Sequence, residues 1–147
     1  YFSLKPGEYP FEFANPGLVD KKINIIDFNS QNYSLCALIF YLFFGRYCYD
    51  GKALIDLPDN TRQEHYAKFQ HYHKMPFIFD KNNCLNAVDV VDEKCADLWN
   101  DCPEMLKNMF TQVLSQNMNR MEDVINPSPF TWLKCLNELG WIPKKKD

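Results

Sequence analysis

The stretch "NYSLCALIFYLFFG" at positions 32–45 constrains the fold more than any other part of the chain. Between Tyr33 and Phe44, Ser34 is the one strongly polar residue. An apolar run of about 12 residues is too short to cross a bilayer, which takes about 20. A helix that is apolar all round is usually buried on every side. We therefore expect residues 32–44 to form a central, fully covered helix, and Leu38→Asp to abolish folding because it would bury an unpaired charge.

Composition favours one densely packed domain over residues 1–147. Hydrophobic residues make up 46% of the chain and aromatic residues 16%, which is too much for a disordered segment. The net charge of -3 includes no basic excess, so a nucleic-acid surface is not expected, and neither is a membrane partner. No signal peptide is visible. Because the chain starts at Tyr1 rather than Met, we expect it to be part of a longer protein.

The six cysteines, at positions 36, 48, 84, 95, 102 and 135, form no Cys-x-x-Cys pair. Cys36 and Cys135 lie within apolar helical patterns, where a thiol behaves as a small hydrophobic group. We expect all six to be reduced, as in a cytoplasmic protein. A secreted domain with three disulfide bonds is the alternative.

Three further stretches have amphipathic helical patterns. Thr61 and Glu64 have capping-box spacing before "QEHYAKFQHYHK". Pro103 opens a helix whose apolar face comprises Met105, Leu106, Met109, Phe110, Val113 and Leu114. The last helix begins at Ser128-Pro129, and its expected apolar face comprises Phe130, Leu133, Leu136 and Leu139. Gly140 stops it, and Trp141 packs back in a Schellman ending.

The segment "MPFIFDKNNCLNAVDVV" is irregular, with one short extended piece expected at 77–79. No series of alternating strands is present to build a sheet, so the predicted fold class is α with long loops.

The order of these features resembles the C-terminal lobe of the protein kinase family, in particular a divergent bacterial group. "NYSLCALIFYLFFGRYCYDG" is similar to the central helix of that lobe, with Ser34 and Gly45 at matching positions. "FANPGL" resembles the Ala-Pro-Glu turn, with Pro16 and Gly17 in place of Pro-Glu. "NPSPFTWLKCL" resembles the Arg-Pro-Ser/Thr motif, with Asn126 and Pro127 in place of Arg-Pro. The resemblance implies that residues 1–18 end an activation segment and that 19–147 form the helical lobe.

Departures from the family pattern concern charged groups. The Glu and Arg that pair between the two motifs are replaced by Gly17 and Asn126, and losing both leaves no orphan charge. The Asp that begins the central helix is replaced by Gln31, which accepts hydrogen bonds without a negative charge. Pro10 stands where the family usually has a Thr.

No Gly-rich loop, catalytic loop or metal-binding Asp motif of a kinase is present in the chain, so the resemblance implies no ATP binding and no phosphotransfer by these residues alone. ATP and Mg²⁺ are expected only for a longer parent. The resemblance implies a substrate or partner surface at Pro10, Phe13 and Leu18, and in the groove beside the helix after Thr61.

Two polar groups have simpler interpretations than a metal site. His65, His71 and His73 are spaced by six and two residues, which does not put three ligands on one helix face, so we expect solvated or interface histidines. Asp89, Asp92, Glu93 and Asp97 are expected to form a solvated helix start.

Three functions remain open: the C-terminal lobe of a serine/threonine kinase-like protein, a pseudokinase scaffold, and an unrelated helical interaction domain. The expected partners are a protein substrate or binding partner, the N-terminal lobe of the parent, and a second copy of the chain, because exposed apolar surface promotes association.

Overall fold

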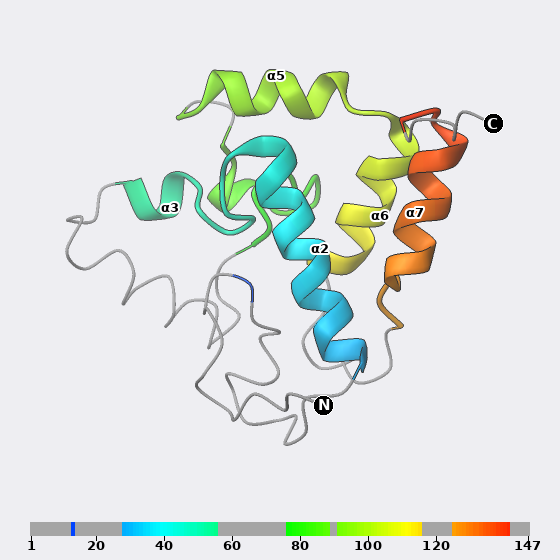
Figure 1. Ribbon diagram of the computed structural model, residues 1–147. Coiled ribbons are helices and arrows are strands. Elements are labelled where there is room, and N and C mark those ends of the chain that lie inside the picture. The colour runs from blue at the N-terminus through cyan, green and yellow to red at the C-terminus, as the bar shows by residue number, and fades with distance from the viewer. Residues whose placement is uncertain (1–12, 14–27, 56–75, 89–90, 116–124, 142–147) are drawn as a thin grey trace.

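The computed structural model describes residues 13, 28–55, 76–88, 91–115 and 125–141 (Figure 1). The α-helices within these ranges are α2 (Phe28–Phe44), α3 (Lys52–Ile55), α5 (Glu93–Asp101), α6 (Glu104–Leu114) and α7 (Pro129–Glu138), and a 3₁₀ turn, η2, spans Cys84–Asn86. None of the described residues is in a strand, which confirms the predicted α class. The expected helix after Thr61 lies outside these ranges, as do His65, His71 and His73.

Helix α2 begins four residues before the predicted start and ends where predicted. Gly45 follows it with φ of 65°, the left-handed conformation that favours glycine, and its N–H donates to the Tyr41 carbonyl at 2.7 Å. The buried face comprises Ser30, Tyr33, Cys36, Ala37, Phe40 and Phe44. This face packs against α5 and α6.

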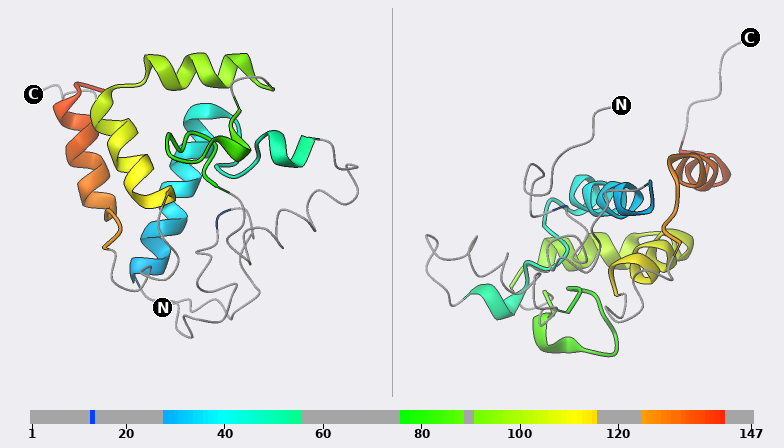
Figure 2. Two further views of the ribbon diagram at one scale, coloured as in Figure 1. Left: turned by 180° about the vertical axis from the view of Figure 1, so that it is seen from behind. Right: turned by 90° about the horizontal axis from the view of Figure 1, so that it is seen from below.

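The opposite face of α2 is exposed at several large side chains and carries no other helix of the described residues. Phe28 is 73% exposed, Leu38 40% and Leu42 72%. The prediction that this helix is buried on every side is therefore wrong, and with it the reason for expecting Leu38→Asp to abolish folding. In the view from below, α5 and α6 lie on the same side of α2 (Figure 2). An apolar composition shows that a helix has surface to bury, but it does not show how many sides the neighbouring helices reach.

Aromatic rings form the centre of the core. The Phe40 centroid lies 4.6 Å from that of Phe44, and 5.4 Å from those of both Phe77 and Phe110. Phe79 and Trp99 stack in parallel, with centroids 4.5 Å apart and planes 3° apart. These contacts join α2, the segment at 76–88, α5 and α6 in one cluster.

Asn86 holds the loops at 45–55 and 76–88 together. Its Nδ2 donates to the carbonyls of Tyr49 and Pro76 at 2.8 and 2.9 Å, and its Oδ1 accepts from Ala53 N at 3.2 Å. The backbone of Gly51 passes so close that an added Cβ would lie 1.9 Å from the Asn86 carbonyl oxygen. A side chain at position 51 would therefore displace this junction.

The extended piece predicted at 77–79 is a turn. Ile78 N donates to Cys48 O at 3.0 Å, but the chain reverses at once, with Asp80 N donating to Phe77 O at 3.0 Å. The apolar side chains suit a strand, but here they are inserted into the aromatic cluster instead.

Helices α5 and α6 largely follow the predicted patterns. Asp92 caps α5 by accepting a hydrogen bond from Cys95 N at 3.0 Å, as expected for a helix start in this acidic stretch. Pro103 immediately precedes α6. The predicted apolar face of α6 is buried at Leu106, Phe110, Val113 and Leu114, is partly buried at Met109 and is exposed at Met105.

Helix α7 has the predicted ends but a different buried face. Ser128 Oγ accepts from Thr131 N, and the two Schellman hydrogen bonds form, Gly140 N to Asn137 O and Trp141 N to Leu136 O, both at 3.0 Å. Phe130 and Leu133, which were expected in the core, are 74% and 56% exposed. The residues buried instead are Trp132 and Cys135.

Candidate functional site

Asn126, one of the kinase-motif positions, anchors the segment before α7 to the start of α2. Its backbone N–H donates to Asn29 Oδ1 at 2.7 Å, and its Nδ2 donates to the Asn29 carbonyl at 2.9 Å. The side chain is 2% exposed. A neutral amide pair therefore makes a buried link at a place where the resemblance implies a charged residue.

The other described motif positions are not gathered into one site. Gln31 is exposed on α2, and Ser34 is half-buried, with its hydroxyl donating to the Ser30 carbonyl at 3.3 Å. Gly45 ends the helix, and half-buried Pro127 precedes the Ser128 cap. Pro16 and Gly17 lie outside the described residues.

Phe13 is the one described residue of the expected partner surface, because Pro10 and Leu18 lie outside the described ranges. Its ring meets those of Tyr41 and Tyr47 edge-on, with centroids 5.9 and 5.6 Å apart. Tyr41 and Tyr47 stack on each other at 4.8 Å. Phe13 is half-buried, so much of its ring is not available to a substrate.

The face of α2 opposite its buried face carries a row of residues, which we call the α2 stripe: Phe28, Gln31, Leu35, Leu38 and Leu42, of which Leu35 is partly buried and packs against the core. The residues are spaced alternately by three and four, which is the spacing of a helix seam that packs against another helix. Helix α2 contains no charged residue. The stripe is therefore an apolar surface with one polar amide.

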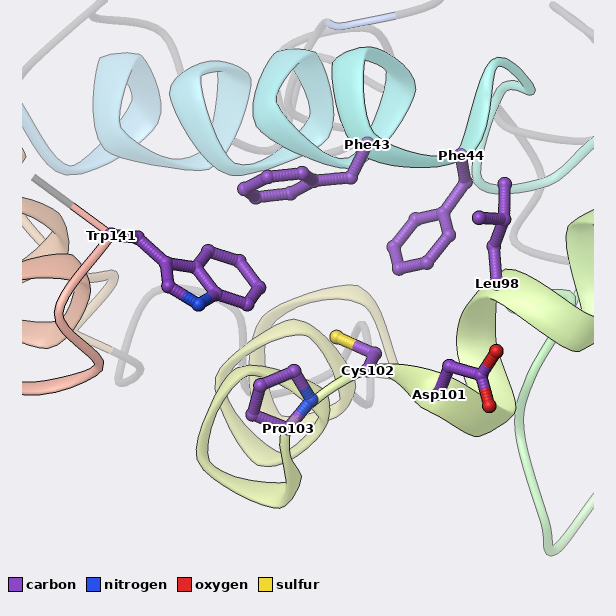
Figure 3. Close-up of a pocket in the computed structure, with 7 residues that line it drawn as sticks. All are labelled: Phe43, Phe44, Leu98, Asp101, Cys102, Pro103 and Trp141. Atoms are coloured by element: carbon purple, nitrogen blue, oxygen red, sulfur yellow. The ribbon is translucent and has the colours of Figure 1, made fainter.

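A pocket of about 210 Å³ lies where α2, α5, α6 and the end of α7 meet; we call it the end pocket. Its lining residues are Phe43, Phe44, Leu98, Asp101, Cys102, Pro103 and Trp141. Phe43 and Phe44 extend from α2, Phe43 with its ring toward Trp141 and Phe44 with its ring toward Cys102, and Leu98 and Asp101 lie on the other side (Figure 3). The walls are apolar except for the Asp101 carboxylate.

An ion pair between the loop after α2 and the start of α5 has a structural role. Arg46 Nη1 lies 3.2 Å from Asp92 Oδ2, which links the loop after α2 to the cap of α5, and Arg46 Nε donates to the Asp50 carbonyl. Both side chains of the Arg46–Asp92 pair are partly exposed, so the pair contributes at most about 1 kcal/mol.

None of the six cysteines is in a disulfide bond. Cys36, Cys48, Cys95 and Cys135 are buried, Cys102 is half-buried and Cys84 is exposed. Burial raises the pKa of the Cys36 thiol, and burial followed by the Asp92 charge raises the pKa of Cys95 to about 11. Burial also raises the pKa of Cys102 in the end pocket. These thiols are protonated at neutral pH and are poor nucleophiles.

No protein family matches the chain, and neither a curated protein nor a solved structure matches it. The candidate sites therefore rest on the geometry of this chain.

Two kinds of site were also sought among the described residues. No group of three or more His, Cys, Asp or Glu side chains in those ranges could hold a metal ion. None of the helices formed by those residues is long and apolar enough to span a membrane.

The sequence analysis did not anticipate the end pocket. Its residues come from three stretches, 43–44, 98–103 and 141, that are brought together only by packing. The available signals were local: two phenylalanines before the glycine that ends α2, and a tryptophan directly after the glycine that ends α7. Each signal marks a helix end, but none indicates which ends meet.

Proposed function

We propose that this chain is a kinase-like helical lobe that acts as a protein-binding scaffold, with the α2 stripe as its docking surface. The observation that carries the proposal is the exposure of Phe28 and Leu42, both above 70%, on a helix without charges. Large apolar side chains exposed together typically mark an interaction surface. The alternating spacing of the stripe fits a partner that is itself helical.

Three local features support the kinase-like part of the proposal. The apolar helix ends at a left-handed glycine, Gly45, and is followed in the chain by further helices. Asn126, in the segment just before α7, hydrogen-bonds to Asn29 at the start of α2. In a kinase lobe the central helix is covered by other segments of the same protein, so the stripe is where such segments would pack.

The open face of α2 equally favours the second candidate, a helical interaction domain unrelated to kinases. The two candidates share the docking surface and differ in what covers it: further kinase segments in the first, a separate protein in the second. Whether a longer parent is an active kinase using ATP and Mg²⁺ or a pseudokinase depends on motifs that this chain does not contain. A cytoplasmic location is part of the proposal, since none of the six cysteines is in a disulfide bond.

The test uses a second copy of the chain as the partner, because an uncovered stripe should pair with itself when no other helix is available. We expect sedimentation velocity to show dimers that increase with concentration across the micromolar range. The double variant Leu38→Asp/Leu42→Asp should be monomeric, because it places charges in the seam. The matched control is Leu133→Asp, which puts a charge on an exposed leucine of α7, and it should dimerise as the unmodified chain does.

Two outcomes would count against the α2 stripe as the docking surface. In the first, the unmodified chain stays monomeric throughout this range; in the second, the control loses its dimers as fully as the double variant. Circular dichroism of all three proteins shows whether each remains helical, so that loss of association is distinguished from loss of the fold.

A further inference from the structure

Three helices end at the end pocket. Phe44 is the last residue of α2, Asp101 is the last residue of α5, and Trp141 completes the Schellman ending of α7. The carbonyl end of a helix carries a partial negative charge, which favours a nearby cation. None of these three helices has a basic residue in its last turn. The carbonyl ends of these three helices therefore give the pocket a negative field, which the amino end of α6 opposes in part.

The walls of the pocket provide aromatic rings and one carboxylate. Phe43 and Trp141 meet edge to face, with centroids 5.9 Å apart and planes at 68°. Phe44 forms the floor beside Phe43, at 6.3 Å. The exposed Asp101 carboxylate forms no ion pair or hydrogen bond with any other described residue. No Lys, Arg or His is among the described residues that line the pocket.

We propose that the end pocket binds an alkylammonium group, a methylated amine whose cationic nitrogen is enclosed by carbon. Such a group is attracted to ring faces and to a carboxylate, and it also buries apolar surface against the rings. An unmodified lysine ammonium is a strongly hydrated point charge and loses more on leaving water. The volume of about 210 Å³ is below the roughly 300–1,000 Å³ of pockets for drug-sized ligands, so the site suits a single head group.

Among the residues that the structure describes, neighbouring charges do not occupy the site. Lys107 donates to the Asn100 carbonyl at 3.3 Å and lies 3.9 Å from the Glu104 carboxylate, and it does not line the pocket. The positive end of α6 also begins at this corner, but Glu104 stands in its first turn. The added cation would therefore meet Asp101 and the rings without displacing an existing ion pair of the described residues.

The first test is calorimetry with tetramethylammonium and choline, with 3,3-dimethylbutan-1-ol as the uncharged isostere of choline. We expect saturable binding of both cations and binding of the isostere at least about tenfold weaker, in line with the strength of cation–π contacts. Failure of both cations to bind, or equal affinity for choline and its isostere, would overturn the proposal, the latter because the pocket would then be merely apolar.

Variants assign the binding to the pocket. Asp101→Asn removes the charge at nearly constant shape and should weaken choline binding about tenfold. Asp97→Asn makes the same charge change one turn earlier in α5, at a residue that does not line the pocket, and should leave the affinity unchanged. Trp141→Leu should also weaken binding, while a melting temperature measured for each variant shows that the fold is retained. Equal affinities for the Asp101 and Asp97 variants would overturn the assignment.

A further arm identifies the source of the head group. A short peptide with one trimethyllysine is compared with choline and with the same peptide carrying unmodified lysine. Tighter binding of the methylated peptide than of choline assigns the ligand to a modified protein, and equal binding assigns it to the head group alone. Preference for the unmodified peptide would contradict the proposal.

Discussion

Asn86 is the residue on which two loops depend. It is fully buried, and its side chain satisfies two carbonyls and one N–H from separate parts of the chain. A buried polar group that loses its partner costs about 1–3 kcal/mol. A single side chain therefore holds the segment after α2 against the segment at 76–88.

Asn86→Ala should lower the free energy of unfolding by about 3 kcal/mol, because it removes hydrogen bonds to one buried and two partly buried backbone groups. Urea denaturation measures the change. The control is Asn82→Ala, which alters an exposed asparagine in the same segment and should change the stability by less than about 0.5 kcal/mol. Equal losses in the two variants would show that the network is not what stabilises the loops.

Alkaline pH should destabilise the fold through its buried thiols. The pKa of Cys95 is raised from the ordinary thiol value of 9.0 to about 11, chiefly by burial. Between these values the unfolded chain has lost the proton and the folded chain retains it, so stability is full below pH 9 and falls as the pH rises toward 11. The raised pKa values of Cys36 and Tyr49 act in the same direction.

Denaturation curves at pH 8, 9, 10 and 11 measure this loss. Cys95→Ala should reduce the slope of stability against pH in the upper half of that range, whereas the exposed Cys84→Ala should leave it unchanged. A stability that is constant up to pH 11 would contradict the expectation.

At the scale of the element, α2 has two apolar faces, and substitutions on them should differ in their effect on the free energy of unfolding. Phe40→Ala should lower the free energy of unfolding by about 4 kcal/mol, because it leaves a cavity among the surrounding rings. Leu42→Ala, two residues away on the exposed face, should change it by less than about 0.5 kcal/mol. Thermal unfolding of the two variants at low protein concentration compares the faces without a contribution from association.

Helix ends were predictable from the sequence, but helix faces were predictable only in part. Gly45, Pro103, Ser128 and Gly140 mark ends through backbone preferences that act locally. The predicted α7 face was wrong at Phe130 and Leu133, because residues spaced only by threes turn gradually around a helix of 3.6 residues per turn, whereas Leu136 and Leu139 are partly buried as predicted. In the observed set of Trp132, Cys135, Leu136 and Leu139, Trp132 lies three and four positions before the next two residues, and Leu139 lies three and four positions after them, so the set stays on one side.

The coverage of α2 and the end pocket depend on tertiary packing. Composition shows which residues tend to be buried. It does not distinguish an apolar helix face that is exposed from one that lies in the core, because both have the same composition. Likewise, the sequence shows Phe43 and Trp141 as two isolated aromatics about a hundred positions apart, and it carries no local signal that their rings meet.

At the scale of the whole molecule, these 147 residues should not bind nucleotide. They contain no Gly-rich phosphate loop and no kinase catalytic loop, and phosphoryl transfer depends on such groups to position phosphates and metal ions. Calorimetry with Mg-ATP at millimolar concentration should show no saturable heat. Binding in the micromolar range would reveal a nucleotide site that neither the motifs nor the described geometry indicates, whereas turnover by a longer parent would be compatible with this result.

The packing around Phe40 also limits how fast its ring can rotate. A benzyl side chain enclosed by Phe44, Phe77, Phe79, Trp99 and Phe110 can rotate by half a turn only when those neighbours move apart together. The flip rate of the Phe40 ring can be measured by nuclear magnetic resonance, from exchange between the signals of its two sides. It therefore reports how often the aromatic core transiently opens. The ring of Phe130, which is exposed to solvent, should flip so fast that its two sides give a single averaged signal.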